Sequence, residues 1–323
     1  MQVSQTMTPR NKKKFTISIV TTIYNEQEVL ADFFSELTNI LDKLKQNYEI
    51  IAVDDGSQDN STTLLIEHHK NNNKIKIIQL SRNFGKDIAL TAGLERATGD
   101  IVIPIDADLQ DPPHLIPKMI DIWQQGYDVV YATRKSRKGE SIIKRTSASL
   151  FYKLFNKMSD TTIPKNTGDF RLIDKKVLNA INNLTERARF MKGLFSWVGF
   201  SQTSIEFIRP ARKYSTTKWN YSKLWNYGLD GIISFSSIPL KIWSYFGICF
   251  AGISFLYGTF TIIKTCVFGI DVPGYASLLV ATLFIGGTIL IGIGIIGEYL
   301  SRIYNEIKQR PIYIKNQEIG FKK

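Results

Sequence analysis

Two long uncharged segments in the last third of the chain most constrain its fold. Ile242–Ile263 and Val272–Gly297 run for 22 and 26 residues without a charged side chain. A helix needs about 20 apolar residues to cross a bilayer, so each segment is long enough. Residues 268–274 between them carry the glycine and proline of a turn. A pair of buried core helices is the alternative, but two consecutive runs favour a transmembrane hairpin of about 242–266 and 274–298, within 239–300.

The charges around the hairpin predict its orientation. Lysines precede the first segment, Arg302 and Lys308 follow the second, and only Lys264 lies near the connection. Cytoplasmic flanks carry an excess of Lys and Arg, so we expect a multi-pass protein of the inner (plasma) membrane with both termini in the cytoplasm, including a 301–323 tail. Trp219–Tyr227 interleaves aromatic residues with lysine. This pattern predicts an interfacial amphipathic helix over 218–238, with an ordinary domain helix as the alternative.

The net charge of +12 at pH 7 raises the question of nucleic acid as a partner. Nine basic residues against two acidic ones lie between Arg134 and Lys165, and five against none lie in Arg209–Lys223. The second cluster immediately precedes the apolar segments. Anionic membrane lipids or a lipid-linked phosphate therefore suit it better than nucleic acid. The first cluster is equally explained as a solvated surface.

The first two thirds of the chain alternate between strand-like and helix-like patterns. Predicted strands cover 17–23, 49–53, 75–80, 101–105 and 128–131, and predicted helices begin near residues 27, 59, 88 and 113. This order implies an α/β domain over 15–217, with a mostly parallel sheet and helices on both faces, behind a polar basic tail of residues 1–14. Pro104 conflicts with a central strand because proline lacks a ladder donor.

Polar segments follow three of these strands, at the edge where such sheets bind ligands. They are Tyr24–Glu26, Asp54–Ser57 and Asp106–Gln110. The last offers hard oxygen ligands for Mg²⁺ or Mn²⁺, and such an ion would also hold a diphosphate. An acidic pair alone often only caps a loop, but three converging segments are better support. The glycine fingerprints of dinucleotide enzymes and P-loop ATPases are absent from the sequence.

Several motifs together carry a family resemblance. They are Tyr24–Glu26, Asp54–Ser57, Asn83–Lys86, Asp106–Pro113, Gly168–Leu172, Arg189–Gly193, Trp197–Phe200 and Lys218–Tyr221. From Ile17 to about Tyr304 the chain resembles glycosyltransferases of family 2, which have the Rossmann-like GT-A fold. Within that family it resembles the polyprenyl-phosphate sugar transferases, which include the bactoprenol glucosyltransferases and dolichyl-phosphate mannose synthase.

The resemblance implies a reaction. A hexose, in the first place glucose from UDP-glucose, would pass with inversion to polyprenyl (undecaprenyl) phosphate on the cytoplasmic face. The product would serve cell-wall or O-antigen glycan modification after a downstream flippase. On the donor side the resemblance assigns base and ribose contacts to Tyr24, Glu26 and Asp55, and phosphate or sugar contacts to Lys86 and Arg134.

The resemblance also implies the catalytic groups. Asp106, Asp108 and Gln110 would hold Mg²⁺ or Mn²⁺, and Arg212 and Lys218 would meet the acceptor phosphate. Asp169 matches the carboxylate usually assigned as the base. A phosphate monoester has a second pKa near ~6, so the acceptor is already mostly ionised at neutral pH. Asp169 is thus also explained by positioning Arg171, a basic neighbour or a sugar hydroxyl rather than by removing a proton.

Three alternatives to glucose transfer remain. Another nucleotide sugar could be the donor, the chain could extend a polysaccharide, or it could be a catalytically silent membrane scaffold or sensor. Two spans give no obvious polymer channel, and the Gln-x-x-Arg-Trp signature of processive enzymes is missing. The hairpin contains many glycines, which suit either a homo-oligomer or packing within the hairpin itself.

Overall fold

The computed structural model describes residues 8–10, 12–135, 164, 167–208, 238–268 and 274–322. Within these ranges the chain forms one eight-stranded sheet in the order β7-β5-β6-β4-β1-β2-β3-β8. The strands are β1 Thr16–Ile23, β2 Asn47–Asp54, β3 Ile75–Leu80, β4 Ile101–Pro104, β5 Val129–Arg134, β6 Thr167–Asp174, β7 Gln202–Phe207 and β8 Lys315–Ile319. Pairs β1–β2, β1–β4, β2–β3 and β5–β7 are parallel, whereas β6 and β8 pair antiparallel with their neighbours.

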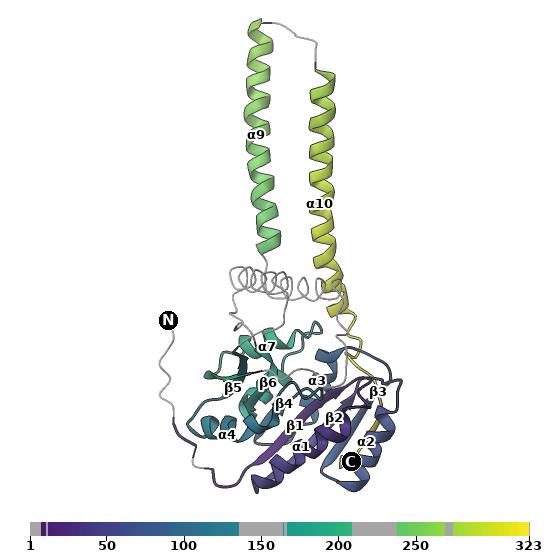
Figure 1. Ribbon diagram of the computed structural model, residues 1–323. Coiled ribbons are helices and arrows are strands. Elements are labelled where there is room, and N and C mark those ends of the chain that lie inside the picture. Colours follow the sequence, from purple (N-terminus) through teal and green to yellow (C-terminus); the bar gives the residue numbers. More distant parts are fainter. Residues whose placement is uncertain are drawn as a thin grey trace.

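Helices cover both faces of the sheet (Figure 1). Side chains of α1 (Leu30–Lys43), α2 (Ser61–Asn71) and α4 (Ile116–Gln124), which follows the short helix η1 (Pro113–Leu115), fill the core of one face. Side chains of α3 (Lys86–Arg96), α6 (Lys175–Asn182) and α7 (Met191–Trp197) fill the core of the other. The central strands are buried along nearly their whole length, as expected for parallel strands covered on both sides. The predicted mostly parallel α/β sheet is confirmed.

Pro104 lies at a position where no strand-to-strand hydrogen bond requires its missing N–H. Ile105 donates its N–H to the Val20 carbonyl at 2.9 Å, so by alternation residue 104 would direct its donor to the β6 side. Pairing of β4 with β6 ends at Val102. The conflict noted in the sequence is therefore resolved by the early end of that ladder.

The segment beyond the apolar helices is more than a tail. Lys315–Ile319 forms β8 along the edge of β3, and the Ser81 N–H donates to Ile314 at 2.9 Å. Tyr313 Oη donates to Glu95 at 2.6 Å. Residues 315–319 of the predicted 301–323 tail thus form the outermost strand of the sheet and cover the edge of β3.

The other end of the chain is also held. Arg10 donates to the carbonyls of Trp123 at 2.7 Å and Tyr127 at 2.6 Å, and it pairs with the buried Asp128. The predicted basic tail of residues 1–14 therefore includes at least one structural residue. Its signal in the sequence is weak, because one arginine in a basic segment looks solvated.

Two long helices extend away from the sheet, α9 (Ile238–Phe268) and α10 (Tyr275–Ile307) (Figure 1). Leu240–Phe260 and Phe284–Ile307 are long and apolar enough to cross a membrane. Their apolar side chains are mostly exposed, unlike those of core helices in a soluble domain. The helices meet at Phe250 and Phe284, whose ring centroids lie 5.6 Å apart. The predicted interfacial helix over 218–238 lies, but for residue 238, outside the described residues.

Candidate active site

The loops after β1 and β2 are tied together at the carboxyl edge of the sheet. Asn25, in the left-handed region with φ 53°, donates its N–H to Ser57 Oγ at 3.0 Å and accepts from the Gln58 N–H at 2.8 Å. The Glu26 N–H donates to Ser61 Oγ at 3.0 Å. Side chains of Tyr24 and Glu26 are half-buried at this point. Two of the three predicted segments, Tyr24–Glu26 and Asp54–Ser57, thus form one hydrogen-bonded wall.

Asp55 supports the loop that leads into α3. Its carboxylate accepts the N–H groups of Phe84 at 2.7 Å and Gly85 at 3.0 Å, and the residue is only 3% exposed. Burial raises its pKa, and the two N–H bonds oppose that shift. Gly56 beside it has φ 69°, and a Cβ there would lie 2.5 Å from the Arg82 carbonyl carbon. The Asp-Asp-Gly-Ser motif is therefore built to position the 82–86 loop, and the predicted nucleotide contact of Asp55 stays a prediction.

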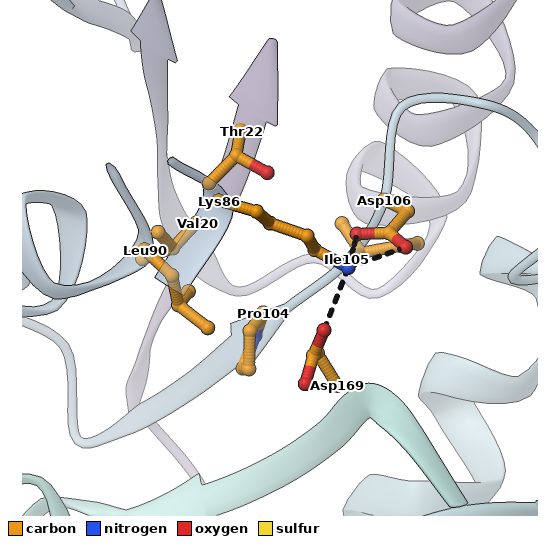
Figure 2. Close-up of a pocket in the computed structure, with 8 residues that line it drawn as sticks. All are labelled: Val20, Thr22, Lys86, Leu90, Pro104, Ile105, Asp106 and Asp169. Atoms are coloured by element: carbon orange, nitrogen blue, oxygen red, sulfur yellow. Dashed lines mark hydrogen bonds and ion pairs between the residues drawn. The ribbon is translucent and has the colours of Figure 1, made fainter. Parts of the chain in front are cut away.

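Lys86 joins two of the predicted acidic residues (Figure 2). Its Nζ lies 2.7 Å from Asp106 Oδ1 and 2.6 Å from Asp169 Oδ2. Lys86 is the first residue of α3, Asp106 follows β4, and Asp169 lies on β6, so three separate elements meet at one ammonium group. Thr22 and Leu90 help to line the narrow pocket around them.

The charge state of Asp169 follows from these neighbours. Burial alone would raise its pKa, but the charges of Lys86, Lys192 and Arg171 and the Lys86 hydrogen bond hold the pKa well below its usual range. Oδ1 of Asp169 is buried without a hydrogen-bond partner among the described residues. An ionised carboxylate with so low a pKa is a weak base. Its position favours holding Lys86 over removing a proton.

The Asp106–Gln110 loop concentrates oxygen donors. Leu109 adopts a left-handed φ of 57°, and Asp108 Oδ1 accepts the Gln110 N–H at 3.1 Å. Asp111, which the sequence analysis did not assign, is 2% exposed. Burial raises its pKa to about 7, and the negative charges of Asp106 and Asp108 add to that rise.

This loop fits a divalent cation by its chemistry. Carboxylate and amide oxygens are the ligands that Mg²⁺ and Mn²⁺ prefer. No group of three or more acidic, His or Cys side chains in the described part of the chain converges as a ready-made metal site. Asp106 is instead neutralised by Lys86 at 2.7 Å. An incoming cation bound with a diphosphate would thus share Asp106 with Lys86.

Arg134 borders the same loop at the end of β5. Its charge opposes the rise in the pKa of Asp111, and its Nε is buried without a partner in the part of the chain that is described. A Cβ on Gly168 would lie 3.4 Å from Arg134 Nη2, so this glycine leaves room for the guanidinium. The position suits the predicted contact with a phosphate or sugar.

Three more residues belong to this site: Arg171, named from the sequence only as a partner of Asp169, and Asp87 and Lys192, which were not assigned. Arg171 lies two residues after Asp169 on the same strand face, donates to the Gly168 carbonyl at 2.8 Å and stacks 4.0 Å from the Phe195 ring centroid. Asp87 follows Lys86, and Lys192 is the second residue of α7; their charges act on Asp169 or on each other. All three lie inside or beside quoted motifs, which was the available signal. The predicted acceptor residues Arg212 and Lys218 lie outside the described residues.

Two family models match this chain. The model of glycosyl transferase family 2 matches residues 18–181, and that of the GtrB C-terminal hairpin matches residues 238–303. The chain belongs to glycosyl transferase family 2. It is a glycosyltransferase with the predicted apolar hairpin.

Two curated relatives cover nearly the whole chain. The glycosyltransferase sll0501 of Synechocystis sp. is 56% identical over 92% of this chain and 94% of its own length. The SfII prophage-derived bactoprenol glucosyl transferase of Shigella flexneri is 46% identical over 92% of this chain and 96% of its own. Among solved structures, glucosyl-3-phosphoglycerate synthase from Mycobacterium tuberculosis, with Mn²⁺, UDP and phosphoglyceric acid, has a TM-score of 0.46 at 17% identity, covering 68% of this chain and 76% of that one. That likeness is too slight to carry an argument.

Proposed function

We propose that this glycosyltransferase moves glucose from UDP-glucose to polyprenyl phosphate at the membrane surface, with inversion at the anomeric carbon. One combination carries the proposal. This chain is 46% identical to a bactoprenol glucosyl transferase over 92% of its length. It also brings Asp106, Lys86 and Asp169 together at the edge of the sheet where ligands of such folds bind. The hairpin family model and the two apolar helices support a lipid acceptor.

The proposal gives each described residue a role on the donor side. Asp106, Asp108 and Gln110 would hold Mg²⁺ or Mn²⁺, which supplies charge neutralisation for the departing diphosphate. Tyr24 and Glu26 form the wall where the nucleoside would lie, on loops fixed by Ser57 and Ser61. Arg134, with an unpaired Nε in the described part of the site, suits the diphosphate or the sugar.

Attack by the acceptor phosphate depends on nearby positive charge more than on a general base. A phosphate monoester with a second pKa near ~6 is mostly ionised at neutral pH, so its oxygen is already nucleophilic. Lys86 and Lys192 place positive charge where two anionic reactants must approach one carbon. Asp169 keeps Lys86 in position and stays ionised. Arg212 and Lys218 remain the sequence-based choice for the lipid phosphate.

Membrane placement is part of the proposal. The hairpin would span the inner membrane twice, with the catalytic domain and both termini in the cytoplasm, where nucleotide sugars are made available. The lipid-linked product would then pass to a downstream flippase. Contact between α10 and the catalytic domain supports a site held close to the bilayer, because Glu306 accepts the Arg187 N–H at 2.8 Å.

A donor panel tests the proposal. Purified full-length protein is given radiolabelled nucleotide sugars, one at a time, with undecaprenyl phosphate and Mg²⁺, and label is counted in the organic phase. UDP-glucose should give the highest transfer, and Asp108→Asn should abolish it while the surface control Asp121→Asn should not. A different best donor would overturn the glucose assignment, water-soluble polymer would favour a polysaccharide synthase, and no transfer from any donor would favour a silent scaffold.

A further inference from the structure

The end of α10 touches a loop that leads directly into the catalytic pocket. Glu306 lies in the last turn of α10, at the end of the apolar stretch Phe284–Ile307 and beyond residue 298, where the sequence-based prediction ends the span. Its Oε1 accepts the backbone N–H of Arg187 at 2.8 Å and of Ala188 at 3.4 Å. These two residues belong to the 183–190 loop between α6 and α7. A side chain of the hairpin therefore holds the backbone of the catalytic domain.

The same loop is surrounded by charge. Arg189 donates to the Leu184 carbonyl at 2.7 Å, while its Nε and Nη1 are buried without partners among the described residues. The carboxylates that act on this guanidinium belong to Glu95, Glu186 and Glu306, from α3, the loop and α10. Tyr313, just before β8, donates to Glu95 at 2.6 Å. The loop is thus fixed at the junction of four separate parts of the chain.

Beyond the loop, α7 begins against the start of α3. Met191 is fully buried, its N–H donates to the Asp87 carboxylate, and its Sδ accepts from Thr91 Oγ1 at 3.6 Å. Lys192 follows, and its charge acts on both Asp87 and Asp169. Figure 1 shows α7 on the side of the catalytic domain that faces the two long helices. An acceptor arriving from the membrane would therefore meet this helix start.

We infer that Glu306 is a positioning residue for the acceptor side of the site. By holding the N–H groups of Arg187 and Ala188, it fixes the loop that leads into α7 and so the position of Lys192, the second residue of that helix. The inference rests on the proposed transfer to a lipid phosphate. It assigns the Arg189–Gly193 motif a purpose that the donor site does not require, which is to couple the second apolar helix to the reaction.

Steady-state kinetics of the full-length protein test the inference. Glu306→Ala should raise the KM for undecaprenyl phosphate about fivefold, the size expected for the net loss of one ordinary hydrogen bond, and leave the KM for the nucleotide sugar within about twofold. Glu306→Gln keeps an acceptor oxygen and should recover most of the loss. Glu298→Ala, two turns earlier on α10, is the matched control and should behave as wild type, because Glu298 contacts Arg302 of its own helix at 3.2 Å.

Hydrogen exchange supplies a readout that needs no substrate. In Glu306→Ala the amides of Arg187 and Ala188 should exchange faster than in wild type, while those of Phe84 and Gly85 should not change. Unchanged exchange at 187–188, equal rises in both KM values, or a Glu306→Gln variant as impaired as Glu306→Ala would each overturn the inference. If wild type transfers nothing to undecaprenyl phosphate, the proposed function fails and the exchange result alone decides whether Glu306 holds the loop.

Discussion

Lys86 Nζ lies 2.6 Å from Asp169 Oδ2. The same ammonium group is 2.7 Å from Asp106 Oδ1, so one cation links the Asp106–Gln110 loop after β4 to Asp169 on β6. Burial alone would lower the pKa of Lys86, but the two carboxylates raise it well above its usual value. Lys86 and Asp169 are therefore both charged near neutral pH. In this arrangement Asp169 holds Lys86 in place, a role that does not require it to act as a base.

Replacing Lys86 with Met should nearly abolish transfer. Two carboxylates would then face the donor diphosphate without their shared cation, and we expect a loss of about 100-fold in kcat/KM, typical for removal of one preorganised electrostatic partner. Lys118→Met, on the exposed face of α4, is the control. Activity of Lys86→Met within about threefold of wild type would show that the bridge has no catalytic role.

Asp87→Asn should stabilise the protein, and more so at alkaline pH. Burial raises the pKa of Asp87 to about 7, Asp169 adds to the rise, and Lys86, Lys192 and the Met191 N–H oppose it. Because the folded-state pKa lies above the unfolded value of about 3.9, ionising Asp87 costs stability as the pH rises from about 4 to 7. Thermal unfolding should show a higher Tm for Asp87→Asn at pH 8, with a gap that shrinks toward pH 5. A gap that does not depend on pH would contradict this view.

Asp128 should stabilise the folded protein, and its contribution should grow as the pH rises, which is the opposite of the trend for Asp87. Burial opposes its ionisation, but Lys176 Nζ at 2.7 Å, Ser201 Oγ at 2.8 Å and Arg10 lower its pKa. The stabilisation is therefore present above the unfolded pKa of about 3.9 and is lost as the pH falls through the folded value. Asp128→Asn should cost about 2 kcal/mol at pH 7 in denaturant unfolding, and the difference should narrow below pH 4. A difference that persists unchanged at low pH would exclude an ionic origin.

Gly56→Ala should displace the 82–86 loop, which borders the proposed nucleotide-sugar site. Its φ of 69° disfavours a side chain, and the new Cβ would lie 2.5 Å from the Arg82 backbone. The 82–86 loop must then move, so we expect the KM for the nucleotide sugar to rise about tenfold, as a small misplacement of a bound reactant commonly costs that much or more. Gly286→Ala meets nothing within 4 Å and should leave the kinetics unchanged. A wild-type donor KM in Gly56→Ala would show that the loop tolerates the shift.

The central sheet was predictable because its strands are short apolar runs followed by polar loops. Ile75–Leu80 was predicted with its exact bounds, and Ile17–Ile23 missed one residue of β1. β6, β7 and β8 were not predicted. β6 buries Asp169 and Arg171 as charged neighbours, and β8 has the sequence Lys-Asn-Gln-Glu-Ile, which lacks alternating apolar residues. Both strands depend on partners distant in sequence, and periodicity cannot report those.

The sequence motifs predicted which residues form the site but not how those residues contact one another. Asp106, Asp169 and Lys86 were all assigned from the resemblance, and the structure brings them together. What the motifs could not indicate is that Lys86 bridges the other two, since that depends on the register of β4 against β6. The contact of Glu306 with Arg187 could not be predicted either, because it joins residues 119 positions apart in the chain.

The most direct test of the account is the fate of the sugar. Purified full-length protein with UDP-glucose labelled in the sugar, undecaprenyl phosphate and Mg²⁺ should give an organic-soluble product that contains one glucose per lipid, joined through a β-linked phosphodiester. Label should stay in the aqueous phase when the lipid is omitted or EDTA is in excess. Transfer that persists in excess EDTA, or label released as free glucose or polymer despite the lipid, would contradict the account.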